Sequence, residues 1–186
     1  MMKRTRRVEA LLMAAAVFAA SVPAFPFGVR AEEPAIVIRT AEEWEELARL
    51  CVSESYSEGK TVTLEADLDL SGKEFVPIPV FRGTFEGNGH TISGVSIRQA
   101  GSGLGLFRYL EKEALVQNLK VSGELKPEGS RKKIGGIAGT NRGTIRNCTF
   151  LGTGEALENL GGIAGINEET GVIENCLNQA ELTGNR

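Results

Sequence analysis

The clearest hydrophobic pattern in the chain is an unbroken alternation over residues 61–70, Thr-Val-Thr-Leu-Glu-Ala-Asp-Leu-Asp-Leu. Apolar side chains take every second position, which is the period of a β-strand with one buried face. Residues 36–38, Ile-Val-Ile, form a shorter apolar stretch that also suits a strand. The pattern predicts β-structure, with the carboxylates of Asp67 and Asp69 on the outer face of the longer strand.

A short amphipathic helix is predicted between these two strands. Residues 40–43, Thr-Ala-Glu-Glu, have the sequence of a capping box, in which the side chains of Thr40 and Glu43 each accept a hydrogen bond from the other residue's backbone amide. Apolar residues then recur at three- and four-residue spacing, as expected of one buried helical face. They are Trp44, Leu47, Ala48, Leu50 and Cys51. We expect this helix to cover the first coil of the fold, with Trp44 in the core.

The rest of the chain repeats itself and is rich in glycine: 20 of the 23 glycines lie between Gly83 and Gly184. Residues 81–97 align without a gap over residues 134–150, and Gly-Gly-Ile-Ala-Gly occurs at 135–139 and again at 161–165. The four aligned units place like residues in four columns: Ile92, Val116, Ile145 and Ile173; Val95, Leu119, Cys148 and Cys176; Gly94, Asn118, Asn147 and Asn175; and Gly83, Gly105, Gly136 and Gly162.

A repeat of this length with short apolar strands is typical of a solenoid. Each unit has only about three short strands, too few to bury a core alone, so stacked coils must bury a continuous column together. Glycine and asparagine recur because each coil turns sharply, and these residues tolerate a positive φ angle at least cost. For Asn118, Asn147 and Asn175 we expect a ladder of side-chain amides at a turn; the alternative is a polar row that grips a ligand.

The repeats resemble a known family. The matching segments are Asp67–Leu70, residues 81–92, residues 105–107 and the two Gly-Gly-Ile-Ala-Gly motifs. They are similar to the GLUG-motif β-helix family of exported bacterial surface proteins, which includes the amino-terminal regions of immunoglobulin A peptidases. The resemblance covers the chain from about residue 36 to its end. It implies an all-β fold: a single-stranded parallel β-helix, a pectate-lyase-like solenoid, with a short N-terminal capping helix.

Two features depart from the family pattern. Arg108 stands where the other units have Gly139 and Gly165, and a basic loop over residues 126–133 lengthens one unit. We expect both to disturb the regularity of the coil without changing the fold.

The first 31 residues have the features of a secretory signal peptide. A basic start over residues 1–7 precedes an apolar run over residues 11–20, and small residues precede a cut after Ala31, with Ala24 as a second option. The apolar run is about half the ~20 residues that a membrane-spanning helix needs. We therefore divide the chain into the signal peptide (1–31), the N-terminal strand and capping helix (32–60) and the β-helix coils (61–186), the last of them incomplete.

Removal of the signal peptide makes the chain more acidic, changing the net charge from −3 to −7. An acidic protein with one short basic stretch argues against nucleic acid and against anionic membranes as partners. The expected partners of this exported chain are host or cell-surface glycans or proteins and the downstream domains of a longer chain, with no membrane contact in the mature form.

Asp67, Asp69 and the lone histidine are the residues that suggest chemistry. Two carboxylates on one face of a strand are half of a Ca²⁺ site, or an acid/base pair of the kind glycoside-cleaving enzymes use, but solvated charges on an outer face are the favoured interpretation. His90 lies in Gly-Asn-Gly-His, a turn sequence, and has no neighbour in the sequence to orient it as a base. We expect no catalytic residue, no cofactor and no metal, with Asp67 and Asp69 as a weak Ca²⁺ candidate.

The three cysteines, Cys51, Cys148 and Cys176, fit no metal-binding spacing. Cys148 and Cys176 take the same position in successive coils, within the Cα distance that a disulfide allows. Parallel side chains nevertheless suit the disulfide dihedral poorly, so an apolar stack is favoured over a bond.

Three classes of function are compatible with these observations. The first is a non-enzymatic, exported scaffold or adhesion module, because every repeated residue has a structural reason. The second is a polysaccharide-binding or polysaccharide-cleaving β-helix protein, by analogy of fold. The third is the non-catalytic front end of a larger secreted peptidase. Because no amphipathic helix follows the last coil, we expect its strand edges to be bare and the product to associate end to end or to fray from residue 160 onward.

Overall fold

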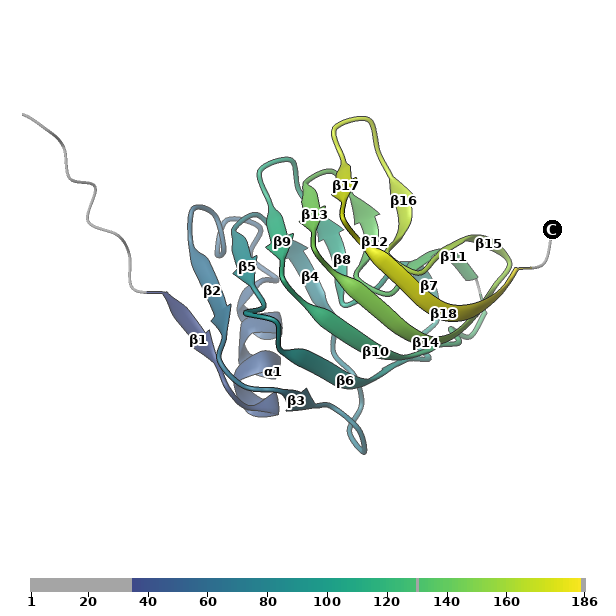
Figure 1. Ribbon diagram of the computed structural model, residues 1–186, viewed down its shortest axis with the longest axis horizontal. Coiled ribbons are helices and arrows are strands. Elements are labelled where there is room, and N and C mark those ends of the chain that lie inside the picture. The colour runs from purple at the N-terminus through teal and green to yellow at the C-terminus, as the bar shows by residue number, and fades with distance from the viewer. Residues whose placement is uncertain (1–34, 130, 185–186) are drawn as a thin grey trace, which may run out of the picture. The chain divides into compact units, whose positions relative to one another are not determined.

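The computed structural model, in which we describe residues 35–129 and 131–184, is a parallel β-solenoid of about five turns (Figure 1). Its one helix within these residues is α1 (Ala41–Leu50). The strands are β1 (Ile36–Ile38), β2 (Thr61–Leu64), β3 (Leu68–Asp69), β4 (Ile78–Phe81), β5 (Thr84–Glu86), β6 (Thr91–Ile97), β7 (Gly101–Leu104), β8 (Phe107–Leu110), β9 (Leu115–Gln117), β10 (Lys120–Leu125), β11 (Arg131–Gly135), β12 (Ala138–Asn141), β13 (Thr144–Arg146), β14 (Thr149–Ala156), β15 (Glu158–Gly161), β16 (Ala164–Asn167), β17 (Val172–Glu174) and β18 (Leu177–Gly184).

The strands form four sheets that run along the solenoid. The first sheet has the order β1-β2-β5-β9-β13-β17, the second β3-β6-β10-β14-β18, the third β7-β11-β15 and the fourth β4-β8-β12-β16. Each strand pairs in parallel with the equivalent strand of the next turn, as in β9 with β13 and β10 with β14. The predicted all-β solenoid is confirmed, but the expectation of three strands per unit is wrong, because a complete turn has four.

The helix forms where its local sequence predicts. Thr40 is the N-cap in an extended conformation; its Oγ1 accepts from the Glu43 amide at 3.3 Å, while the Thr40 amide donates to Glu43 Oε2 at 3.1 Å. Trp44, Leu47 and Ala48 are buried on the inner face. The helix ends at Leu50, one residue earlier than predicted, with Cys51 as its C-cap.

The alternating stretch over residues 61–70 is not one strand. It divides into β2, in the first sheet, and β3, in the second, with a bend between them. The inward side chains still alternate across this corner: Val62, Leu64, Leu68 and Leu70 are all buried. Strict alternation thus predicts which side chains face the core but does not detect a corner at which the backbone stays extended.

The predicted columns are correct in the later turns and wrong in the first. Val116, Ile145 and Ile173 are stacked, as expected. Phe85, and not Ile92, precedes Val116 in that column. Ile92 instead pairs with Val121 in the second sheet, so the gap-free alignment of residues 81–97 matched strands of two different sheets.

Two other columns need the same correction at their first member. Val95 pairs with Gly123 and is not part of the Leu119, Cys148 and Cys176 column. Gly94, with a φ of 72°, lies at the register shift of β6 against β10, which marks a β-bulge, and the residue with the left-handed conformation of the later asparagines is Asn88. The alignment used an offset of 53 residues, whereas Phe85 and Ile145 are 60 residues apart and Ile92 and Phe150 are 58 apart. It therefore set β5 over the start of β12 and β6 over β13, which lie in other sheets.

The glycine column also divides. Gly83 directly precedes β5 and is in register with Ala114 and Gly143, because Thr84 pairs with Leu115 and Leu115 with Thr144. Gly136 and Gly162 lie between the third and fourth sheets, where the Gly136 amide donates to the carbonyl of Gly162 at 3.1 Å. Gly105 lies at the same corner but directly follows Leu104, which pairs with Ile134, so it is in register with Gly135 and not with Gly136. Gly83 is therefore a corner residue of the first sheet and does not belong with them.

The Gly-Gly-Ile-Ala-Gly motifs let two sheets meet without side chains between them. A Cβ on Gly139 would lie 2.2 Å from the carbonyl carbon of Gly103, and one on Gly165 would lie 2.3 Å from that of Lys133. The isoleucine and alanine of the first motif, Ile137 and Ala138, are both fully buried in the core. Glycine is required at this narrow edge of the coil because backbone approaches backbone.

The core begins as an aromatic cluster at the N-terminal end. Trp44 contacts Phe85 and Phe107 edge-on, with ring centroids 6.1 and 6.2 Å apart, and Phe81 lies 5.2 Å from Phe107. The Trp44 indole donates to the carbonyl of Val76 at 3.0 Å, which satisfies its polar atom. Trp44 is a core residue, as predicted, and α1 covers the first turns.

Candidate functional site

The only histidine is paired with one of the predicted carboxylates. His90 Nδ1 lies 3.1 Å from Asp67 Oδ1, and the same oxygen accepts from the Thr91 amide at 2.8 Å. The Thr91 amide first, and then His90, hold the pKa of Asp67 below its usual range. His90 closes a turn in which its own amide donates to the carbonyl of Gly87 at 2.8 Å. The pair joins this turn to the preceding coil across an exposed surface.

Asp69 makes a separate local contact. Its Oδ1 accepts from the Ser71 amide at 2.9 Å, which lowers the pKa of the carboxyl group. The two carboxylates thus cap different segments of backbone. Within residues 35–129 and 131–184, no three His, Cys, Asp or Glu side chains are grouped so as to hold a metal ion. The Ca²⁺ candidate formed by Asp67 and Asp69 therefore gains no third ligand among them.

The asparagine column forms a polar corner along the first sheet. Asn118, Asn147 and Asn175 all have φ between 52° and 56°. Asn147 Nδ2 donates to Asn118 Oδ1 at 3.1 Å, and Asn118 Nδ2 continues the chain to Glu86 Oε1 at 2.9 Å. The left-handed corner and the amide contact support a structural role for these residues.

The two stacked cysteines are free thiols. Cys148 is buried, and its burial raises the pKa of the thiol to about 12. Cys176, one turn later, is only partly buried and lies at the last turn. The third cysteine, Cys51, is fully buried, and burial raises the pKa of its thiol to about 11. Thiols with such pKa values are protonated at neutral pH and behave as small apolar groups.

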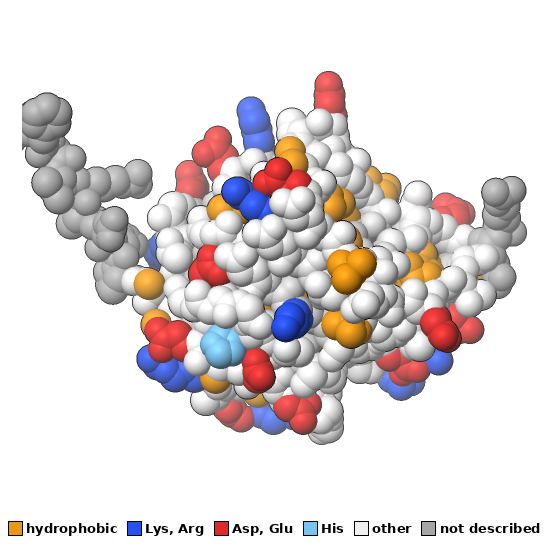
Figure 2. All heavy atoms as spheres, viewed as in Figure 1, with side chains coloured by type: hydrophobic (Ala, Val, Ile, Leu, Met, Phe, Trp, Pro, Cys, Tyr) orange, Lys and Arg blue, Asp and Glu red, His pale blue; other side chains and the backbone are white. Residues whose placement is uncertain are grey.

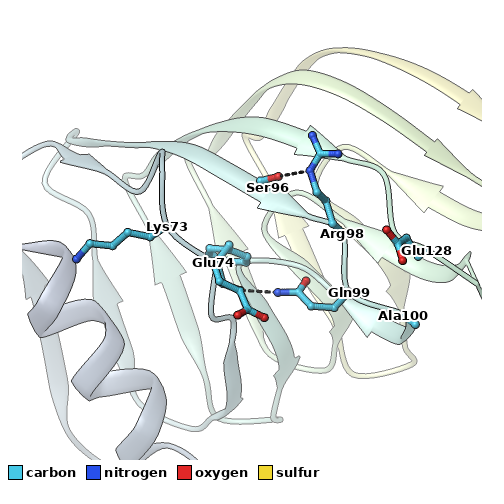
Figure 3. A pocket seen from close by; sticks show the side chains of 8 residues that line it. Lys73, Glu74, Ser96, Arg98, Gln99, Ala100 and Glu128 are labelled. Atoms are coloured by element: carbon cyan, nitrogen blue, oxygen red, sulfur yellow. Dashed lines mark hydrogen bonds between the residues drawn. The ribbon is translucent and has the colours of Figure 1, made fainter.

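A surface pocket of about 360 Å³ lies where the first turn has no strand in the third sheet (Figure 3). The loop between β3 and β4, the link between β6 and β7 and the loop after β10 enclose it. Its lining is Lys73, Glu74, Phe75, Ser96, Arg98, Gln99, Ala100 and Glu128. This pocket joins segments that no sequence motif connected.

The cationic side chains around the pocket are already paired with neighbouring residues. Figure 3 shows Lys73 extending toward α1, where its Nζ lies 2.6 Å from Glu42 Oε1. Arg98 donates to Ser96 Oγ at 3.1 Å and to Glu124 Oε2 at 2.7 Å. The Gln99 amide group donates to the carbonyl of Phe75, and its Oε1 is buried without a hydrogen-bond partner among the described residues.

The C-terminal turn exposes positions that other turns bury. Ile173 is 39% exposed, although Ile145 below it in the same column is fully buried. Leu177 and Val172 are 51% and 45% exposed, but they take outward positions, in register with Thr149 and Thr144 of the preceding turn. On the face in Figure 2, hydrophobic side chains lie over the middle of the molecule and toward this end, and charged side chains lie both among them and along the margin.

The predicted signal peptide, residues 1–31, lies outside the described residues. Among the residues that are described, no helix has the length and apolar character needed to cross a bilayer.

Comparison with known proteins identifies two distant relatives. A stretch of 136 residues is 32% identical to halomucin of Haloquadratum walsbyi and covers 64% of this chain but only 2% of halomucin. A stretch of 94 residues is 35% identical to a protein of Evansella cellulosilytica described as a Gly-rich membrane protein, covering 47% of this chain and 11% of that protein. No family model matches the chain. No solved structure matches it.

The fold and these comparisons together define the class of protein to which the chain belongs. It is a parallel β-solenoid module with distant similarity to much longer proteins, and it spans only a small part of the relatives that it matches.

Proposed function

We propose that this chain is an exported, non-enzymatic β-helical module of the GLUG-motif type that acts at the cell surface as a scaffold or in adhesion. The observation that carries the proposal is the use of the repeated residues. The inward positions Val116 and Ile145 fill the core, the left-handed asparagines build the corners, and Gly139 and Gly165 allow the sheets to meet. The repeat is thus devoted to stacking, which holds the turns in a fixed order and leaves their outward positions free.

Two further facts support this proposal. The N-terminal sequence has the features of a signal peptide, which would carry the module out of the cytoplasm. The distant relatives are far longer than this chain, as expected if such modules serve as segments of extended proteins.

The test is to express the full chain with its own leader in a bacterial host and to measure both secretion and adhesion. We expect a product that starts at Glu32, is recovered outside the cytoplasm, and makes beads that carry it adhere to glycan-coated or protein-coated surfaces. The matched control is Ile145→Asp, which removes the fold while keeping the rest of the sequence. A product that retains Met1 contradicts export. Beads that bind no better than the control contradict adhesion and leave only the scaffold role, and release of reducing sugars from any polysaccharide contradicts the non-enzymatic role.

The pocket favours a second candidate function, polysaccharide binding. Arg98, Ser96, Glu74 and Glu128 supply polar groups around a recess of a size that holds one or two sugar rings. Arg98→Ala combined with Glu74→Ala should abolish binding to a polysaccharide array if this pocket is the site. The control pair, Lys112→Ala with Glu113→Ala in the exposed link between β8 and β9, should leave binding unchanged. Equal binding by both pairs would exclude the pocket.

A further inference from the structure

One motif of the sequence has no part in the packing described above. Residues 147–149, Asn-Cys-Thr, match the acceptor sequence for N-linked glycosylation: asparagine, any residue except proline, then serine or threonine. The match occurs once in the 186 residues. The other asparagines of the same column lack the hydroxyl, because Asn118 is followed by Leu-Lys and Asn175 by Cys-Leu. Stacking alone therefore does not account for the threonine of this motif.

The fold places this acceptor at the surface. Asn147 is exposed and lies in the corner between β13 and β14, with a φ of 52°. Thr149 begins β14 at an outward position, in register with Lys120 before it and Leu177 after it. A glycan is bulky and hydrophilic, so it requires a surface position of this kind in an exported chain. Only Cys148, between the two, points into the core.

The structural role of Asn147 is compatible with modification. Its Nδ2 donates to Asn118 Oδ1 at 3.1 Å, the one hydrogen bond that this nitrogen makes with the described residues. An amide nitrogen of asparagine carries two hydrogens. When a sugar replaces one of them, the other remains to donate to Asn118. The amide ladder at this corner can thus persist beneath an attached glycan.

We propose that Asn147 is the acceptor of an N-linked glycan on the exported chain. The donor class is an oligosaccharide joined through pyrophosphate to a membrane lipid. A bond forms between Asn147 Nδ2 and C1 of the first sugar, and the bond between that C1 and the pyrophosphate oxygen breaks. Nδ2 loses one proton, and the lipid pyrophosphate leaves. The inference rests on the export part of the proposed function, since such a transfer occurs outside the cytoplasm.

Secretion of the full chain from a yeast, which attaches N-linked glycans to its exported proteins, tests the proposal. We expect a product that is heavier than its sequence by the mass of a glycan. Peptide-N-glycosidase should remove the excess mass and convert the acceptor asparagine to aspartate, and a peptide mass map should locate that conversion at residue 147. A secreted chain without a glycan, or with a glycan only at another residue, would overturn the proposal.

A second version distinguishes this inference from the export on which it rests. It carries the signal peptide of a yeast protein in place of residues 1–31, so it enters the secretory pathway whatever the native leader does. If it is secreted with a glycan while the full chain stays inside the cell, export by residues 1–31 is wrong and the acceptor site is right. If it is secreted without a glycan, the acceptor site is wrong.

Substitutions in the motif test whether the threonine selects this asparagine. Asn147→Gln and Thr149→Val should each abolish the glycan, whereas Thr149→Ser keeps a hydroxyl and should retain it on part of the product. Asn175→Gln is the matched control, because it changes an asparagine of the same column that has no threonine two residues later. Circular dichroism of Thr149→Val should match that of the parent chain, since this side chain faces outward. A glycan on Thr149→Val, or its loss from Asn175→Gln, would overturn the assignment.

Discussion

The two ends of the solenoid bury their core positions to different extents. At the N-terminal end, Trp44, Phe81, Phe85 and Phe107 form a buried aromatic cluster under α1. At the C-terminal end, Ile173 occupies a core column yet is 39% exposed, and Asn178 stands where the preceding turn has the buried Phe150. Each turn of a solenoid is core for one neighbour and cover for the other, so a turn with a single neighbour retains only part of its burial. Stability should therefore fall from the covered end toward the open one.

The largest expected effect compares the same side chain in two turns. Ile145→Asp places a charge in a fully buried apolar column and should cost several kcal/mol, enough to unfold the stack. Ile173→Asp, one turn later in the same column, should cost about 1 kcal/mol because water already reaches the site. Urea denaturation measures both values.

A control for this comparison is Arg146→Asp, whose side chain faces outward and lies 2.9 Å from Glu174 Oε1. It removes a surface ion pair worth at most about 1 kcal/mol. Equal losses for Ile145→Asp and Arg146→Asp would show that the inward and outward assignments are wrong.

The second effect concerns the covered end. Trp44→Ala removes the side chain that joins α1 to Phe85 and Phe107 and should destabilise the fold by about 3–5 kcal/mol. Ile173→Ala should cost less than about 1 kcal/mol, since part of that side chain is exposed. Calorimetric Tm values that fell equally for the two variants would remove the contrast between the ends.

The third effect concerns the narrow edge of the coil. Gly139→Ala puts a methyl group 2.2 Å from a backbone carbon, which cannot move without shifting the third sheet, and should cost about 1–3 kcal/mol or more. Gly89→Ala is the control: its Cβ would meet nothing within 4 Å, so only the positive φ of 77° opposes it, at about 1 kcal/mol. If thermal melts ranked the two in the opposite order, close backbone contact would not be the reason for glycine in the motif.

The smallest effect is an acid dependence. The Thr91 amide and His90 hold the pKa of Asp67 below its ordinary value, so the carboxylate stabilises the fold above about pH 4 and loses this contribution as the pH falls below that value. Between pH 4 and pH 2 the Tm of the parent chain should fall slightly more than that of Asp67→Asn. Glu113→Gln, which also removes one carboxylate, serves as the control. If Tm fell equally between pH 4 and pH 2 in all three proteins, Asp67 would not be the source of the acid dependence.

The sequence predicted those parts of the fold that depend on local periodicity. The capping box at Thr40, the inward positions from Val62 to Leu70, and the stacking of Val116 on Ile145 follow from residues close in the chain or from turns of nearly equal length. The first column members failed because the alignment set β6 over β13, a strand of another sheet. Both strands begin with Thr-Ile after a glycine-containing turn, so the sequence does not distinguish them.

The candidate sites were less predictable. The pocket joins Glu74, Gln99 and Glu128, which three different turns bring together where the third sheet lacks a strand. The length of β18, which pairs with β14 over eight residues, was equally hard to predict. Alternation in Leu-Asn-Gln-Ala-Glu-Leu-Thr-Gly is weak, so the sequence gives little indication of a strand of this length.

In-register stacking also means that the length of the solenoid is set by its number of turns. Consecutive strands of a sheet lie about 4.8 Å apart, so each additional turn lengthens the axis by that amount whatever its sequence on the outside. The later turns differ in length by only a residue or so, with Ile145 29 residues after Val116 and Ile173 28 residues after Ile145. Duplication of one such segment in the gene would insert a turn between compatible neighbours. The reach of such a protein can therefore evolve in equal steps, by copying, without any new solution to the folding problem.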